Sequence, residues 1–329
     1  MNREEKQRIQ TLADGVRGRA RAAYRDQIRI RKPDLPFPYG APPTPHSVET
    51  LPVEKKTGAN FDTEWARRPS ARVARAAIVE GLMRPTVSLL ARPSREGKDR
   101  LHGLDRKQAV IFVANHHSHI DTPLILTSLP EPWRSKTVIG GAADYFFSNR
   151  VSGAASALAL NAIPIERERT TRRSTNEATD LIQDGWSLLI FPEGGRSKDG
   201  WGQPFRAGAA YLAQRCEVPI VPIHVTGSGQ ILSKGRSLPK PASTTVNFGS
   251  PLRSEPDESS RRFSARVEAA VEALADETTT DWWQARQRAH STDSPTLQGP
   301  QVSAWRRQWA LGDKSRSTQR RVRRWPFVS

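Results

Sequence analysis

The sequence predicts an α/β fold, with a mixed, mostly parallel central sheet flanked by helices. Two observations indicate this fold: short apolar runs rich in β-branched residues alternate with helical patterns between residues 108 and 252, whereas both ends of the chain are polar, basic and poor in large aliphatic residues. Apolar strands that alternate with helices are covered on both faces, and ligands then bind at the carboxyl ends of the strands. We therefore expect a single catalytic domain with an N-terminal helical extension and basic tails.

Two predicted segments precede the domain. Residues 1–64 form a basic and Pro-rich extension, in which basic helical patterning gives way to an extended linker at residues 33–46, where prolines prevent a helix or a central strand. Residues 65–100 form an amphipathic helical segment, because apolar residues recur near helical spacing from Arg68 to Leu90 with arginines among them, until Pro85 interrupts the pattern. This basic helix either packs on the core or lies on an anionic surface, and the sequence leaves both roles open.

Residues 101–278 are predicted to form the catalytic domain. Its strands are short apolar runs such as AVIFVA, and its helices are the amphipathic stretches between them. The predicted strands cover residues 109–114, 137–140, 161–165, 186–191, 220–225 and 244–248, and the predicted helices cover residues 121–129, 144–160, 171–184, 205–216 and 257–275. Residues 279–329 follow as an Arg/Trp-rich C-terminal tail, much of which we expect to be disordered.

Composition limits the partners and the compartment. The formal net charge of +17 favours nucleic acid, acidic lipid surfaces or phosphorylated ligands as partners. Cys216 is the only cysteine, which excludes an internal disulfide and a cysteine zinc cluster and fits a reducing compartment. The N-terminus lacks the apolar region of a signal peptide, and the apolar stretch at residues 151–165 is shorter than the ~20 residues of a membrane span. We expect a cytoplasmic protein whose contact with a membrane is peripheral.

The sequence VANHHSHID, residues 113–121, concentrates polar side chains directly after a buried strand. His116, at the carboxyl end of this strand, can act as a general base if the carboxylate of Asp121 accepts a hydrogen bond from its other ring nitrogen. A strand-to-helix turn can bring residues five positions apart into contact. Asn115 and Ser118 lie beside the pair, and Ser118 is a candidate N-cap of the following helix.

Two other interpretations of this segment stay open. In the first, the polar residues only cap the helix, and Asp121 interacts favourably with the helix dipole. In the second, His117 and His119 join the general-base pair as metal ligands. A metal site is disfavoured because three ligands within one turn rarely converge on one ion and the sequence contains no second ligand cluster, so we expect no metal.

A second polar segment, residues 188–200, follows another buried strand. In its sequence LLIFPEGGRSKDG, Gly194 and Gly195 allow a sharp turn and the close approach of a ligand. Arg196 supplies a planar guanidinium group suited to a phosphate, and Glu193 either orders the loop or holds an acceptor hydroxyl. An ordinary turn without a ligand is the alternative.

The two segments together resemble the glycerophospholipid acyltransferase family, typified by 1-acylglycerol-3-phosphate acyltransferase. Its first motif is Asn-His-x-x-x-x-Asp (the HX4D motif) and its third is Phe-Pro-Glu-Gly-x-Arg-Ser, and this chain carries both in the same order. NAIPIERERTTRR is similar to the second motif and VPIVPIHVTG to the fourth, so the resemblance covers residues 105–255. The matching residues are Asn115, His116, Ser118 and Asp121, then Arg167, and then Phe191, Pro192, Glu193, Gly194, Arg196 and Ser197. This chain has Gly195 where the third motif commonly has threonine.

The resemblance implies that a fatty acyl group moves from an acyl-CoA or acyl-ACP thioester to a hydroxyl of lysophosphatidate, in phospholipid biosynthesis. His116 would be the general base and Asp121 would orient it, with no cofactor beyond the thioester co-substrate. A main-chain N–H beside His116 or in the glycine turn would stabilise the oxyanion. The expected substrate-binding residues are Asn115, Ser118, Arg167, Glu193, Gly194, Gly195, Arg196 and Ser197.

Other functions stay open at this stage. An enzyme of the same family could acylate another lipid, a glycolipid or a metabolite hydroxyl. The charge and the Arg/Trp-rich ends also fit a basic nucleic-acid- or membrane-binding protein without catalysis, although no recognised nucleic-acid module is present and we expect no nucleic-acid partner. For the enzyme, the basic helix and tail predict peripheral binding to an anionic surface at the inner face of the membrane.

Overall fold

The computed structural model describes residues 58, 61–166, 172–196, 200–232 and 238–299. All of them belong to one compact unit of the chain, Lys56–Ser329. The helix and linker predicted within residues 1–57, the last thirty residues of the predicted tail, and two candidate site residues, Arg167 and Ser197, lie outside the described residues.

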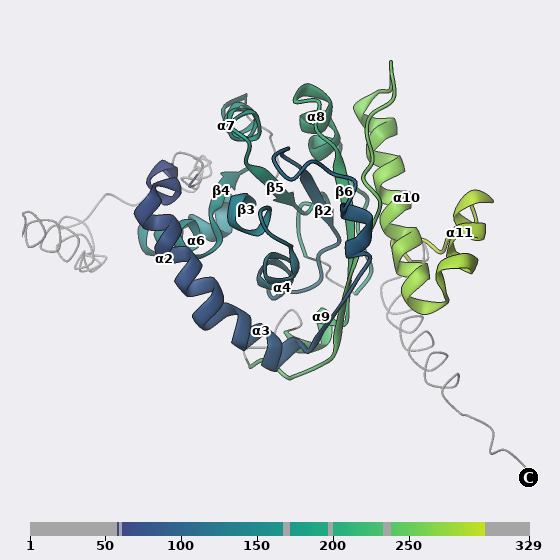
Figure 1. Cartoon of the computed structure of the whole chain (residues 1–329), viewed down its shortest axis with the longest axis horizontal. Helices are drawn as coiled ribbons and strands as arrows, with labels where there is room; N and C mark the ends of the chain where they lie inside the picture. Colours follow the sequence, from purple (N-terminus) through teal and green to yellow (C-terminus); the bar gives the residue numbers. More distant parts are fainter. Residues whose placement is uncertain (1–57, 59–60, 167–171, 197–199, 233–237, 300–329) are drawn as a thin grey trace, which may run out of the picture. The chain divides into compact units, whose positions relative to one another are not determined.

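Within the described residues, the core is a seven-stranded sheet in the order β1-β7-β6-β2-β5-β3-β4 (Figure 1). The neighbours from β6 to β4 are parallel, β7 is antiparallel to β6, and β1 is parallel to β7. This confirms the predicted mixed, mostly parallel sheet. The strands are β1 (Pro93–Glu96), β2 (Ile111–Ala114), β3 (Thr137–Ala142), β4 (Ala162–Ile165), β5 (Ser187–Ile190), β6 (Ile220–Thr226) and β7 (Thr244–Phe248).

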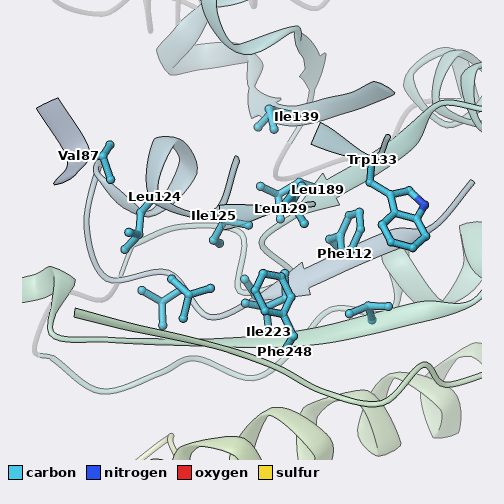
Figure 2. Close-up of a cluster of buried hydrophobic side chains, with 14 of the residues drawn as sticks. Val87, Phe112, Leu124, Ile125, Leu129, Trp133, Ile139, Leu189, Ile223 and Phe248 are labelled. Carbon is cyan, nitrogen blue, oxygen red and sulfur yellow. The ribbon is translucent and has the colours of Figure 1, made fainter. Parts of the chain in front are cut away.

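Two hydrophobic cores cover the two faces of the sheet. The central strand β2 shows the alternation: Phe112 belongs to one core, and its neighbours Ile111 and Val113 belong to the other. The first core, shown in Figure 2, packs α4 (Asp121–Ser128), α9 (Ser228–Ile231) and the end of α3 against the sheet. The second packs α7 (Arg172–Gln183), α8 (Gly208–Arg215) and α10 (Ser260–Thr279) against it. Each fully buried large aliphatic or aromatic side chain contributes ~1.5–3 kcal/mol, so both faces stabilise the sheet.

The segment predicted to be helical from residue 65 to 100 is helical mainly in its first three quarters, which end at Ala91. A short 3-10 turn, η2 (Glu64–Arg67), leads into one continuous rod made of α2 (Pro69–Ile78), the π-helical turn η3 (Val79–Met83) and α3 (Arg84–Ala91). The prediction that Pro85 interrupts the helix was wrong. The π turn lies directly before Pro85, and its hydrogen bonds already depart from the regular α-helical pattern. The N–H that proline lacks is therefore missing at a place where the regular hydrogen bonds are already interrupted. The prediction was also wrong at β1, which is a strand at the edge of the sheet.

The rod turns apolar side chains outward and one arginine inward. Val73 and Leu82 are mostly exposed, whereas Arg75 is buried. The Arg75 guanidinium donates to the main-chain oxygens of Leu158 and Ala157, at 2.9 and 3.1 Å, near the end of α6 (Arg150–Leu160). Burial, with the charges of neighbouring arginines, lowers the pKa of Arg75 to about 10. A buried cation on helix carbonyls thus fixes the rod to the domain.

One more sequence prediction is corrected, and part of another is now described. The helix predicted over residues 144–160 is two helices, α5 (Ala143–Phe146) and α6, because Asn149 caps the second by accepting a hydrogen bond from Ser152 N at 2.9 Å. The first part of the predicted tail forms α11 (Trp282–His290), which packs on α10; most of the tail, in which we expect disorder, lies outside the described residues. Short 3-10 turns η4 (Lys98–Leu101) and η5 (Arg134–Lys136) complete the described elements, and no helix among them is long and apolar enough to cross a membrane.

Candidate active site

The turn between β2 and α4 holds the first candidate residues. Nδ1 of His116 lies 2.9 Å from Oδ2 of Asp121, so the two predicted catalytic side chains are in contact. The same oxygen accepts hydrogen bonds from the main-chain N–H groups of His117 and Ser118, both at 2.8 Å. Asp121, in the first turn of α4, therefore binds the backbone and the histidine ring of the turn that precedes the helix. Its side chain is fully buried.

The electrostatics of the pair set the tautomer of the histidine. Burial raises the pKa of Asp121, but the hydrogen bond and charge of the His116 ring, with smaller contributions from Ser228 and Ser118, outweigh burial and hold the pKa below its usual value. Because the carboxylate is ionised, we assign the proton of His116 to Nδ1 and leave Nε2 as the basic nitrogen. This is the tautomer that a general base requires.

Phe191 and Glu193, which follow the end of β5, hold the same histidine in place. The ring of Phe191 stacks on the ring of His116, with centroids 4.2 Å apart and an interplanar angle of 21°. Glu193 is buried, and its Oε1 accepts the main-chain N–H of His116 at 2.8 Å while its Oε2 accepts that of Gln203 at 2.9 Å. Burial raises the pKa of Glu193 to about 7. Both oxygens of this predicted substrate-binding residue thus contact the backbone.

Asn115 and Ser118, also predicted to bind substrate, are fully buried. The Asn115 amide exchanges two hydrogen bonds with the backbone of Val225 on β6, at 2.9 and 2.7 Å, and donates to Nδ1 of His117 at 3.0 Å. The Ser118 hydroxyl donates to the carbonyl of Leu232 at 3.0 Å. The prediction that Ser118 caps α4 was wrong, because the residue at the N-cap is Ile120, without a side-chain cap. Asn115 and Ser118 hold the turn against β6 and the end of α9.

The glycine turn after β5 brings the third group of candidates to the same edge of the sheet. Gly194 has φ of +72°, and a Cβ there would lie 2.9 Å from Cζ of Arg206. Gly195 faces open space, with no atom within 4 Å of the Cβ position. Burial, with a smaller contribution from the charge of Arg196, lowers the pKa of His119.

The three histidines of the first motif point to different partners. His117 receives the Asn115 amide, and Nε2 of His119 lies 3.1 Å from the hydroxyl of Tyr145, whose ring stacks on it. Burial lowers the pKa of His117, so it stays neutral. Within the described part of the chain, no three His, Cys, Asp or Glu side chains are arranged to hold a metal ion.

A cavity of about 350 Å³ opens beside His116. It lies over the carboxyl ends of β3, β4 and β5 and between α7 and α8, and most of its wall is apolar. His116, Gly194, Gly195 and Arg206 line it near the turn, and Ile165, Ala178 and Leu212 line it farther in. The basic nitrogen of His116 thus stands at an apolar cavity, which suits a substrate with a hydrocarbon chain.

Residues 96–226 match the family model described as Acyltransferase. A chloroplastic 1-acyl-sn-glycerol-3-phosphate acyltransferase of Brassica napus is 35% identical over 129 residues, which are 38% of this chain and 35% of the relative. The 1-acyl-sn-glycerol-3-phosphate acyltransferase of Limnanthes douglasii is 31% identical over 152 residues, 45% of this chain and 52% of the relative. Residues 96–226 of this chain thus resemble the acyltransferase family and these two relatives. The chain spans about half the length or less of these two relatives.

A solved structure has the same fold as most of this chain. The crystal structure of the 1-acyl-sn-glycerophosphate acyltransferase PlsC from Thermotoga maritima matches with a TM-score of 0.51 and 23% identity, over 68% of this chain and 88% of that one. The match extends beyond the family region and agrees with the mixed sheet flanked by helices.

Sequence reasoning missed several residues of the candidate site. It matched Phe191 to a motif without foreseeing the ring stacking on His116. It did not find Gln203 and Arg206, which contact the Glu193 carboxylate and the glycine turn, or Tyr145 beside His119. Their partners lie 10 to 26 positions away in the chain, and no short-range pattern marks such contacts.

Proposed function

We propose that the protein is an O-acyltransferase that moves a fatty acyl group from an acyl-CoA or acyl-ACP thioester to the free hydroxyl of lysophosphatidate, 1-acyl-sn-glycerol 3-phosphate, in phospholipid biosynthesis. The observation that carries the proposal is the His116–Asp121 pair at the mouth of an apolar cavity. The relatives named 1-acyl-sn-glycerol-3-phosphate acyltransferase support the choice of acceptor.

In the proposed reaction, Nε2 of His116 takes the proton of the acceptor hydroxyl as that oxygen attacks the thioester carbonyl carbon. The tetrahedral intermediate then collapses, the carbon–sulfur bond breaks, and the imidazolium returns the proton to the leaving thiolate. Asp121 holds the ring and stabilises its charged form throughout. The products are an ester and a free thiol, and no cofactor is required beyond the thioester co-substrate.

The hydrogen bonds of the turn narrow the choice of oxyanion donor. The N–H groups of His116, His117 and Ser118 already donate to carboxylates. The N–H of Gly194 donates to the carbonyl of Phe191 at 3.2 Å. The N–H of Gly195 has no acceptor among the described residues, and Gly195 lines the cavity. We therefore assign oxyanion stabilisation to Gly195 N–H.

The two substrates would occupy different parts of the site. Burial of an acyl chain in the apolar cavity contributes ~0.8 kcal/mol for each methylene group removed from water. Arg196, at the same edge of the sheet as His116, would bind the acceptor phosphate, and Arg167 is proposed for the same role by its place in the second motif.

The rod formed by α2, η3 and α3 supports a peripheral contact with an anionic membrane surface. Its exposed apolar side chains include Leu82 and Leu89, at 66% and 72% exposure. A group of four cations, one of them on the rod itself, lies at this place, and the pKa values of Arg95 and Lys98 are lowered by burial and by the neighbouring charges of this group. The four are Arg84, Arg95, Lys98 and Arg134. Exposed apolar side chains on the rod, together with the nearby group of cations, suit the interface of an acidic bilayer, and we place the enzyme at the inner face of the membrane.

The direct test is acceptor-dependent thiol release from a panel of acyl-CoA and acyl-ACP thioesters, comparing the wild type with His116→Ala and Asp121→Asn. We expect release with lysophosphatidate, a loss of at least 10³-fold in His116→Ala and a smaller loss in Asp121→Asn, because a residue that orients the base is less essential than the base.

Acceptor controls separate the alternatives. Glycerol 3-phosphate and a phosphate-free monoacylglycerol serve as competing acceptors, each with Arg196→Gln. A wild type that prefers the phosphate-free acceptor and is unaffected by Arg196→Gln would contradict the lysophosphatidate assignment. Full activity in His116→Ala would contradict the mechanism.

A further inference from the structure

The described end of the chain runs beside the active site. We infer that residues 294–299, the C-terminal strap, form a positioning element: they hold residues 200–206, the bridging loop, and through this loop they fix Glu193 and the backbone of His116. The kinetic part of this inference rests on the proposed acyl-transfer function. The strap lies well outside the region that matches the acyltransferase family model, residues 96–226.

Contacts between the strap and the bridging loop are close. The main-chain N–H of Gly202 donates to the carbonyl of Leu297 at 2.8 Å. Gly299 packs against the indole of Trp201, and a Cβ at position 299 would lie only 2.3 Å from this ring. Gly299 also has φ of +70°, a conformation that side chains with a Cβ rarely adopt. The strap needs a glycine here because it covers Trp201, which is only 6% exposed.

Helix α10 holds the strap and the bridging loop together. Oε1 of Glu272 accepts the N–H of Leu297 at 3.0 Å. Oε1 of Glu268 accepts the side-chain amide of Gln298 at 2.7 Å, and its other oxygen accepts the N–H of Phe205, in the bridging loop, at 3.3 Å. A single carboxylate on the helix thus contacts both segments.

The bridging loop in turn contacts the catalytic machinery. The N–H of Gln203 donates to Oε2 of Glu193 at 2.9 Å, and Oε1 of Glu193 accepts the N–H of His116 at 2.8 Å. The N–H of Arg206 donates to the carbonyl of Pro192 at 3.0 Å, next to the glycine turn. A continuous series of hydrogen bonds therefore runs from the strap through the bridging loop and Glu193 to the general base.

This arrangement predicts an effect on turnover more than on substrate affinity. No residue of the strap is among those that line the cavity, so its release leaves the binding groups of the cavity in place. The bridging loop would lose its support and Glu193 one of its two backbone contacts. Small misplacements of a base cost up to about 10²-fold in rate, and we expect a roughly tenfold loss of kcat.

The test uses the full chain with Gly299→Val, which places a branched side chain against Trp201. Gly103→Val is the matched control, because its Cβ position has no atom within 4 Å and its φ is not positive. A double variant, Glu268→Gln with Glu272→Gln, loosens the strap from the helix side. Residue-resolved amide hydrogen exchange and steady-state kinetics with palmitoyl-CoA and lysophosphatidate are measured on each.

We expect Gly299→Val and the double variant to exchange the amides of Gly202, Gln203 and His116 faster and to lose about tenfold in kcat with KM changed less than threefold, while Gly103→Val matches the wild type. Faster exchange at Gly202 alone, with kcat unchanged, would overturn the inference. Unchanged exchange at Gly202 in both strap variants would overturn it too, since the contacts would then be absent in solution. Amide exchange measures the coupling between the strap and His116 even if the protein does not catalyse the proposed reaction. Failure of the inference can therefore be distinguished from failure of the proposed function.

Discussion

At the residue scale, one carboxylate oxygen organises the reacting end of the site. Oδ2 of Asp121 accepts the His116 ring proton and the N–H groups of His117 and Ser118. The spacing of five residues between the histidine and the aspartate is therefore a structural requirement: it is the length of a turn that leaves β2 and enters α4 with the carboxylate returning to the ring. An asparagine at position 121 would keep the shape and lose the charge that stabilises the imidazolium.

The two glycines of the turn after β5 have different constraints, and matched alanine substitutions separate them. Gly194→Ala should destabilise the fold by ~1–2 kcal/mol, because its φ of +72° is costly for alanine and its Cβ would displace the Arg206 guanidinium. Gly195→Ala should be neutral or stabilise by ~0.4–1 kcal/mol, because its Cβ position is open and the unfolded chain loses freedom. Urea unfolding of both variants measures the difference, and equal effects would contradict this account.

The raised pKa of Glu193 predicts a pH dependence of stability. Burial raises its pKa from 4.5 to about 7 in the folded state, so between these values the folded state binds more protons than the unfolded state. The stability that Glu193 contributes is therefore highest below pH 4.5 and falls as the pH rises to about 7, by a total of ~3 kcal/mol.

Glu193→Gln removes this titration. The free energy of unfolding of the variant minus that of the wild type should thus increase between pH 4.5 and 7.5, on top of a constant loss from one weakened backbone contact. Denaturant titrations at half-unit pH intervals give this difference, and a flat difference would show that Glu193 does not titrate in this range.

At the scale of elements, the sequence predicted the strands correctly from their apolar runs, but it misplaced helix boundaries that depend on local hydrogen bonding. All six predicted strands are present because buried parallel strands are short apolar runs. The edge strand β1 has the sequence PSRE, with half its residues exposed, so no apolar run announced it. The π turn before Pro85 and the break at Asn149 depend on local hydrogen bonding that helical periodicity does not encode.

For the candidate site, the sequence likewise predicted some features and missed others: it predicted which motif residues meet, but not all of their roles. The motif residues His116, Asp121 and Glu193 meet as their order on strand ends suggests, because parallel strands place their carboxyl ends at one edge. Their roles were less predictable: Asn115 has the polarity of a ligand-binding residue, yet its amide is used in full by β6 and His117. The bridging loop and the strap lay outside every recognised motif, because their contacts with α10 are far apart in sequence.

At the scale of the whole molecule, the basic residues behind the net charge of +17 have different roles. Some arginines are structural, such as Arg75 on the carbonyls of α6 and Arg288, which lies 2.8 Å from the buried Asp276. Others converge around Glu80 of the rod, where Arg84 and Arg134 share this carboxylate and the charges of Arg95 and Lys98 add to theirs. The excess charge at this place, rather than the total, is what an anionic bilayer would sense.

Binding to vesicles tests this localisation. Wild-type protein should bind vesicles that contain phosphatidylglycerol and release them as salt rises from 50 to 500 mM, while vesicles of phosphatidylcholine alone bind weakly. Arg95→Gln with Lys98→Gln should weaken binding about 30-fold, since each cation near an acidic surface contributes ~1 kcal/mol. The control with the same change of charge is Arg261→Gln with Arg262→Gln, two exposed arginines on α10. An equal loss in both double variants would mean that the total charge governs binding and that the rod has no special place in it, whereas a loss confined to the first identifies the surface that faces the lipid.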